Sequence, residues 1–117
     1  MKLSEIVTIL DAEVHTGRED MDMDIYSACG SDLMSDVMAY VKENVLLLTG
    51  LVNLQVIRTA EMMDIRVVAF VRGKKPTQNM IELAAEKGIT VLTIKHPLFI
   101  ACGKLYSEGL RGSGVWA

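Results

Sequence analysis

Residues 45–71 read VLLLTGLVNLQVIRTAEMMDIRVVAFV, and this stretch decides the fold. It holds an apolar run at 45–49, a helix-length segment at 53–63 that opens with Asn53, and a second apolar run at 67–71. Strands covered on both faces read as continuous apolar runs, and parallel strands need a crossover connection between them, usually a helix. The stretch therefore predicts a strand–helix–strand unit of a parallel sheet.

The same alternation continues on both sides of this unit. Further apolar runs lie at 25–29 and 90–94, and further helix-length segments lie at 32–42, 77–87 and 97–108. A short helix at 5–11 capped by Ser4, a brief extended segment at 13–17 and an exposed acidic loop at 18–24 are expected before them. We predict a three-layer α/β/α fold with a short, mainly parallel sheet of about four to five strands. Residues 1–112 are expected to form a single domain, and the glycine-rich residues 113–117 a flexible tail.

Composition limits the classes of function. Half of the 117 residues are hydrophobic, the mean hydropathy is +0.30 and the formal net charge is −3. A negative balance offers no field for a phosphate backbone, so no nucleic acid is expected, and no apolar run reaches the length of a membrane span. Glu5 interrupts what would be a secretory signal. Cys29 and Cys102 are too few for a disulfide scaffold or a metal site, so we expect a cytoplasmic protein with reduced thiols.

A candidate ligand site lies in the loops that follow the predicted strands. In an open parallel sheet, ligands bind where the carboxyl ends of strands meet loops and helix amino termini. The candidate binding residues are Gly30, Ser31, Asp32, Gly50, Asn53, Arg72, Gly73, Lys74, Lys75, Lys95 and His96. The cations among them predict a site for an adenine nucleotide or another anion. The alternative is that the lysines are in loops because loops are solvated.

Sequence motifs give little support to catalysis. Gly73-Lys74 lacks the preceding glycine and the following hydroxyl residue of a phosphate-binding loop, and no three-glycine dinucleotide motif follows Gly30. No metal or cofactor is expected. An enzyme that uses Cys29, Asp32 or His96 remains an alternative, because a thiol near a helix start, a carboxylate or an imidazole can carry acid–base or nucleophilic chemistry.

The stretch SDLMSDVM, residues 31–38, predicts a helix capped by Ser31 or Asp32. Its apolar positions recur at steps of three and four residues and are rich in methionine. They form either part of the core or, with Met34, Met38 and Tyr40, an adaptable subunit contact. We predict a homodimer with these three residues in its interface.

Several segments together resemble the DRTGG-domain family, which is related to the amino-terminal domain of HPr kinase/phosphorylase. They are KLSEIV at 2–7, SDLMSDVMA at 31–39, RGKKP at 72–76, AEKGI at 85–89, GKLY at 103–106 and GLRG at 109–112. In the name-giving motif, Asp22 holds the aspartate position, Met23 replaces the arginine, and Tyr26-Ser27-Ala28 replaces threonine-glycine-glycine. Ser27 and Ala28 thus add side chains where glycines would let a ligand approach the backbone.

The resemblance implies a three-layer α/β fold, dimerisation and a regulatory or accessory role. Such domains occur beside phosphotransacetylase domains and between CBS domains of pyrophosphatases, and as stand-alone proteins among redox genes. We therefore expect a non-catalytic regulatory or accessory domain that is homodimeric and binds an adenine nucleotide or other anion at the strand-end loops. The alternatives are an interaction subunit of a larger redox or metabolic enzyme that has no small ligand, and the small enzyme described above.

Overall fold

The computed structural model describes residues 1–40 and 44–112, with the backbone alone for Tyr40. Its helices are α1 (Leu3–Leu10), the 3-10 helix η1 (Arg18–Asp20), α2 (Met34–Tyr40), α3 (Leu54–Met62), α4 (Gln78–Glu86) and α5 (Leu98–Ser107). Its strands are β1 (Glu13–Val14), β2 (Ser27–Gly30), β3 (Val45–Thr49), β4 (Val67–Phe70), β5 (Thr90–Thr93) and β6 (Arg111–Gly112). The predicted alternation of strands and helices is confirmed.

The strands form one six-stranded sheet in the order β1-β5-β4-β3-β2-β6. All neighbouring pairs are parallel except β1, which pairs antiparallel with β5. Strands β2 to β5 follow one another in sequence and in space, so every crossover steps to the adjacent strand. Crossovers of one hand that all step in one direction place their helices on one face of the sheet. The other face must be covered from elsewhere in the chain.

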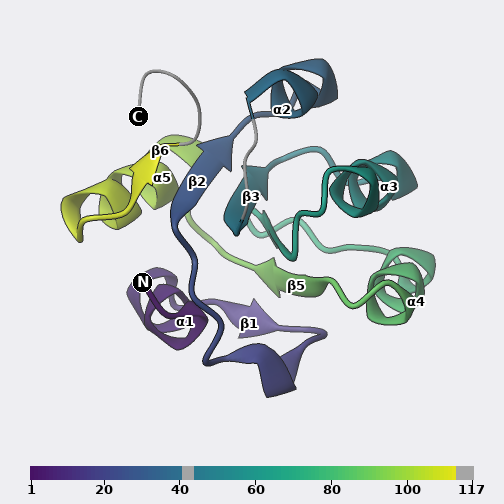
Figure 1. The fold of residues 1–117 in the computed structure, drawn as a ribbon, viewed down its shortest axis with the longest axis horizontal. Coiled ribbons are helices and arrows are strands. Elements are labelled where there is room, and N and C mark those ends of the chain that lie inside the picture. The colour runs from purple at the N-terminus through teal and green to yellow at the C-terminus, as the bar shows by residue number, and fades with distance from the viewer. Residues whose placement is uncertain (41–43, 113–117) are drawn as a thin grey trace.

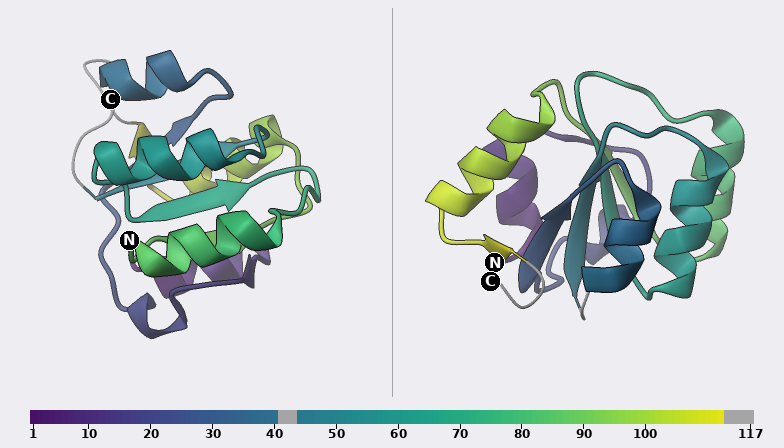
Figure 2. Two further views of the ribbon diagram at one scale, coloured as in Figure 1. Left: turned by 90° about the vertical axis from the view of Figure 1, so that its right-hand side faces the viewer. Right: turned by 90° about the horizontal axis from the view of Figure 1, so that it is seen from above.

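Three layers result, as predicted. Helices α2, α3 and α4 cover one face, and α1 and α5 cover the other (Figures 1 and 2). The buried side chains of β3 alternate between the two cores, with Leu46 and Leu48 facing α1 and α5 and Leu47 facing the crossover helices. The first and last helices of the chain thus complete a core that the crossovers leave half open. Within the described residues, no helix has the length and apolar character needed to span a bilayer.

Several predicted boundaries were wrong for physical reasons. Helix α1 begins two residues early, after Lys2, and the side chain of Ser4 does not cap it; the Lys2 amide instead donates to the Glu5 carboxylate at 3.2 Å. The segment 18–24 is not a wholly exposed loop, because it contains η1 and its half-buried Met21 and Met23 pack against the core. Strand β6 was missed, since two exposed residues carry no recognisable pattern. The predicted tail at 113–117 lies outside the described residues.

Candidate functional site

The loops after β2, β3, β4 and β5 meet at one edge of the sheet, as their parallel direction requires. The Asp32 carboxylate accepts a hydrogen bond from the Gly50 amide at 2.6 Å, which joins the first two loops. Lys74 Nζ donates to the Gly50 carbonyl at 2.7 Å and joins the second to the third. The Arg72 amide donates to the His96 carbonyl at 2.8 Å and joins the third to the fourth. We call this set of loops the strand-end rim.

Asp32 has a different role from the one predicted. Besides the Gly50 amide, Asp32 Oδ1 accepts a hydrogen bond from Thr49 Oγ1 at 3.1 Å. Both donors belong to buried residues at the end of β3, whereas Asp32 itself is exposed. Its carboxylate therefore closes the end of a neighbouring strand and does not cap α2, which begins at Met34 and not at residue 32. Ser31 Oγ instead accepts from the Leu33 amide at 3.0 Å.

Many backbone amides of the rim already have partners within the protein. Arg72 and Gly73 both adopt left-handed backbone conformations, with φ of 63° and 68°. This turn directs the Arg72 amide to His96 and the Gly73 amide to the carbonyl of Ile94 at 2.9 Å. Asn53 caps α3 by accepting from the Val56 amide at 3.2 Å. These three amides, of Arg72, Gly73 and Val56, are therefore already paired within the protein.

The side chains of the rim make it cationic. Arg72, Lys74, Lys75 and Lys95 are exposed, and His96 is half-buried beside them. The two ion pairs found among the described residues, Lys2–Asp24 and Lys87–Glu61, do not involve these cations. Asp32 is the carboxylate that hydrogen-bonds within the rim. The rim therefore offers positive charge to an anion even though the chain is acidic as a whole.

The rim glycines differ in the space around them. A Cβ on Gly30 would lie 2.8 Å from Cys102 Sγ and 3.2 Å from Leu98 Cδ1, so this glycine lets β2 pack closely against α5 although the residue itself is exposed. A Cβ on Gly50 would make ordinary contact with the Asp32 carboxylate at 3.4 Å, and one on Gly73 would meet nothing within 4 Å. Gly73 is therefore exposed, whereas Gly50 is buried beneath the Asp32 carboxylate.

The residues proposed for catalysis are not brought together. Burial raises the pKa of the Cys29 thiol, with smaller contributions from Cys102 and Asp36, and burial also raises the pKa of the Cys102 thiol. A raised pKa is the opposite of what an activated nucleophile requires. In the part of the chain that the structure describes, no hydrogen bond joins Cys29, Asp32 and His96 to one another, and no group of three potential metal ligands occurs.

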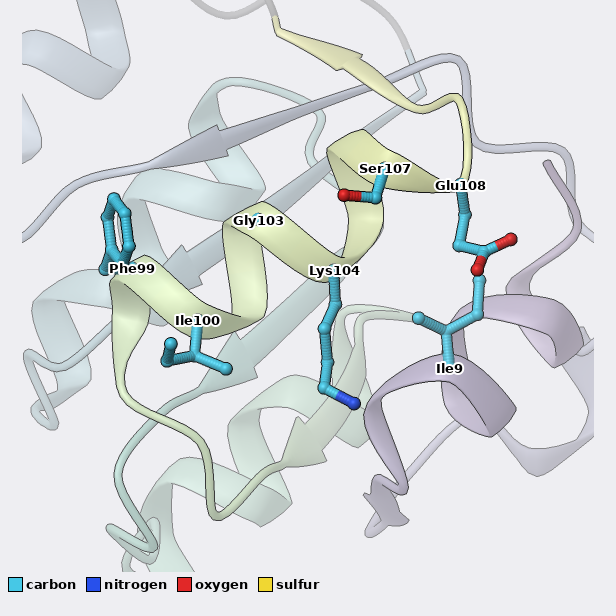
Figure 3. Close-up of a pocket in the computed structure, with 7 residues that line it drawn as sticks. All are labelled: Ile9, Phe99, Ile100, Gly103, Lys104, Ser107 and Glu108. Carbon is cyan, nitrogen blue, oxygen red and sulfur yellow. The ribbon is translucent and has the colours of Figure 1, made fainter.

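Exposed apolar surface lies partly at the predicted interface residues and partly elsewhere. Met34 is buried in the core, Met38 is 46% exposed on α2, and the side chain of Tyr40 lies outside the described residues. The most exposed large apolar side chain among the described residues is Phe99, at 84%, on the first turn of α5. Beside it, Ile100 and Lys104 of α5, Glu108 just after this helix and Ile9 of α1 line a groove of about 440 Å³ (Figure 3). The sequence predicted a helix at 97–108 but did not show which of its apolar side chains would be exposed, because that depends on how the helix packs on the sheet.

The chain is an α/β domain with a mainly parallel sheet between two helical layers and cationic loops at the carboxyl edge of the sheet. The chain belongs to the DRTGG-domain family, because the model of the DRTGG domain matches residues 5–104. The resemblance inferred from the sequence is confirmed. In this chain the positions that correspond to the motif's glycines, Ser27 and Ala28, pair with β6 at the start of β2, away from the strand-end rim.

A solved structure shares the fold. It contains the CBS and DRTGG domains of the regulatory region of Clostridium perfringens pyrophosphatase, complexed with the activator diadenosine tetraphosphate. The two chains have a TM-score of 0.74 and 20% sequence identity, over 89% of this chain and 45% of the other. This chain thus corresponds to less than half of that regulatory region, and the likeness is one of fold. No curated protein matches the chain.

Proposed function

We propose that this chain is a non-catalytic regulatory or accessory domain that binds an adenine nucleotide, or a related anion with a phosphate chain, at the strand-end rim. The observation that carries the proposal is the gathering of Arg72, Lys74, Lys75 and Lys95 on one rim whose loops are joined by hydrogen bonds. Guanidinium and ammonium groups are the usual partners of phosphate oxygens. The family membership and the activator of the pyrophosphatase regulatory region, an adenine dinucleotide with four phosphates, support the same ligand class.

The test is thermal stabilisation of the full chain by ATP and by diadenosine tetraphosphate. A ligand that binds the folded state raises the melting temperature by mass action. We expect Lys74→Ala with Lys75→Ala to abolish the nucleotide-induced rise, with a small loss of stability in the free protein because Lys74 donates to the Gly50 carbonyl. Arg66→Ala with Lys104→Ala is the matched control, since it removes equal charge from two exposed residues outside the rim. An equal response in both double variants would refute the rim site.

A second candidate function is supported by the exposed side chain of Phe99. Large exposed apolar side chains beside a groove are typical of protein contacts, so the domain would act as an interaction subunit of a larger enzyme. In that case neither nucleotide would change the melting temperature. Phe99→Ser would then weaken capture of the partner from the native host, and Met62→Ser, at a comparably exposed methionine on α3, would not.

We further propose that the chain acts in the cytoplasm as a homodimer. Exposed apolar side chains on both α2 and α5, Met38 and Phe99, provide the surfaces on which two copies can pack. Sedimentation of the 12.9 kDa chain at micromolar concentration should give twice the monomer mass. Met38→Asp and Phe99→Asp then identify the helix in the contact, because a buried charge at an interface disrupts it. A single-chain mass for the unmodified protein would contradict the dimer.

A further inference from the structure

The end of β3 forms a small cradle for an anion, and Asp32 fills it. Two donors, the Gly50 amide at 2.6 Å and the Thr49 hydroxyl at 3.1 Å, converge on one carboxylate oxygen, Asp32 Oδ1. On the other side of Gly50, its carbonyl holds the ammonium group of Lys74 at 2.7 Å. Two convergent donors with a cation on the same glycine are the elements from which proteins build phosphate and carboxylate sites.

The donors are buried, but the carboxylate that satisfies them is not. Thr49 and Gly50 are buried at the end of a central strand, whereas Asp32 is an exposed residue in the loop before α2. If Asp32 moved away, both donors would lose their acceptor in a poorly hydrated position, which is costly unless another acceptor replaces it. The two buried donors therefore depend on the carboxylate of an exposed residue.

Asp32 also connects this cradle to α2. The helix begins two residues later, at Met34, and has buried Met34 and Val37, with the exposed Met38 one turn after Met34. The hydrogen bonds of Asp32 fix the start of the helix to β3. The Ser31 amide separately donates to the Leu48 carbonyl at 3.0 Å, so a group that replaces the carboxylate would loosen Asp32 and Leu33, the residues that lead into α2.

We propose that Asp32 is an internal competitor of the ligand: it fills the cradle in the free protein, and a phosphate group of the bound ligand replaces it and frees the start of α2. This inference rests on the proposed function. It specifies where one phosphate binds and how that binding changes the start of α2. By linkage, a partner that binds the released α2 raises the affinity for the ligand by the same factor that the ligand raises the partner's affinity.

Substitutions at Asp32 test the competition, with inorganic phosphate as the probe. Asp32→Ala leaves the cradle donors unpaired, so the free variant should melt at a lower temperature, and phosphate should stabilise it with about tenfold or greater affinity than the unmodified chain. Asp32→Asn keeps an acceptor oxygen but not the charge, so its melting temperature and phosphate affinity should be intermediate. It replaces the alanine variant in the test if that variant folds poorly. Asp36→Asn, an exposed residue four positions on, makes the same change of charge outside the cradle and should leave phosphate affinity within about twofold.

Gly50→Ala tests the size of the site. The added methyl would lie 3.4 and 3.5 Å from the two oxygens of Asp32 and 3.7 Å from Val71 Cγ2, which are ordinary contacts, so the free protein tolerates it. A tetrahedral phosphate is larger than a carboxylate and would meet that methyl group. We therefore expect Gly50→Ala, combined with Asp32→Ala, to cancel the gain in phosphate affinity.

Hydrogen exchange tests the release of α2. Saturating diadenosine tetraphosphate should speed exchange of the amides at 33–38 in the unmodified chain, and Asp32→Ala should show the faster exchange without ligand. The competitor role is overturned if Asp32→Ala binds phosphate no more tightly than Asp36→Asn, or if the ligand slows or does not change exchange at 33–38. If those results occur while nucleotides still stabilise the unmodified chain but not the variant that lacks Lys74 and Lys75, the proposed function survives alone. If no form binds phosphate or nucleotide, both proposals fall.

Discussion

The centre of the sheet and the strand-end rim are held together by different interactions: apolar burial in the centre, and side-chain hydrogen bonds at the rim. In β3, Val45, Leu46, Leu47 and Leu48 have no exposed surface, so this strand contributes to stability through burial on both faces. One residue further on, Thr49 and Gly50 are held by side chains from two other loops. Removing apolar surface from the centre should cost folding free energy, whereas changing charge at the rim should alter what the protein binds.

The largest expected effect is a loss of stability when a buried side chain is removed from the centre of the sheet. Leu47→Ala removes a fully buried side chain from the core beneath α2, α3 and α4, so unfolding free energy should fall by about 2–5 kcal/mol. Chemical denaturation measures it. Leu54→Ala, at a partly exposed position of α3, is the control and should cost well under half as much. Similar losses at both positions would mean that the sheet centre does not dominate stability.

Alanine substitutions at Gly30 and Gly103 compare a closely packed glycine with one that has open space around it. Gly30→Ala places a methyl 2.8 Å from Cys102 Sγ, so we expect a loss of about 1–3 kcal/mol from overpacking. Gly103→Ala on α5 meets nothing within 4 Å and should add about 0.5–1 kcal/mol, because alanine favours the helix. Denaturant midpoints of the two variants should therefore shift in opposite directions. If Gly30→Ala raised the denaturant midpoint, as Gly103→Ala should, the added methyl group at Gly30 would have open space around it.

A smaller loss of stability is expected at alkaline pH, where the thiols of Cys29 and Cys102 ionise. Burial raises the pKa of Cys29 and of Cys102 in the folded protein, so above about pH 9 the unfolded chain ionises its thiols first. The thiol contribution to stability should be constant below that pH and should decline as the pH rises further. Melting temperatures of the chain and of Cys29→Ser with Cys102→Ser, measured from pH 7 to 10.5, should converge with rising pH. Parallel curves would contradict the raised pKa values.

The smallest expected effect on stability belongs to the rim cations. Lys75→Ala and Lys95→Ala remove exposed charges and should change unfolding free energy by no more than about 0.5 kcal/mol. Each should weaken nucleotide binding about two- to fivefold, the range of an exposed ion pair. Calorimetric titration measures the binding. If either variant lost stability but bound nucleotide as tightly as the unmodified chain, these lysines would contribute to folding and not to binding.

The sequence predicts the centre better than the rim because burial leaves a local pattern. The strand predicted at 45–49 is β3 residue for residue, since it is covered on both faces and contains no polar side chain before Thr49. The two-residue edge strand β6 has no such pattern, and its pairing depends on β2, more than 80 residues earlier. Prediction therefore weakens from the middle of the sheet toward its edges.

Asp32 shows why the candidate site was predicted only in part. A carboxylate before a helix is an ordinary cap, and the local sequence supports that interpretation. Its actual partners, Thr49 and Gly50, lie 17 and 18 residues away and are donors only because β2 and β3 run parallel in this register. The loops that form the rim could be named from the strand pattern. Which of their amides were already satisfied could not, because that depends on tertiary contacts.

The most direct test of the account is an amide chemical-shift titration of the full chain with diadenosine tetraphosphate. We expect the largest shifts at the strand-end rim, on Gly50, Leu51 and the turn at Arg72 and Gly73, with further shifts at the start of α2. Shifts confined to the groove between α1 and α5, or no shifts at saturating nucleotide, would contradict the claim that the rim is the ligand site.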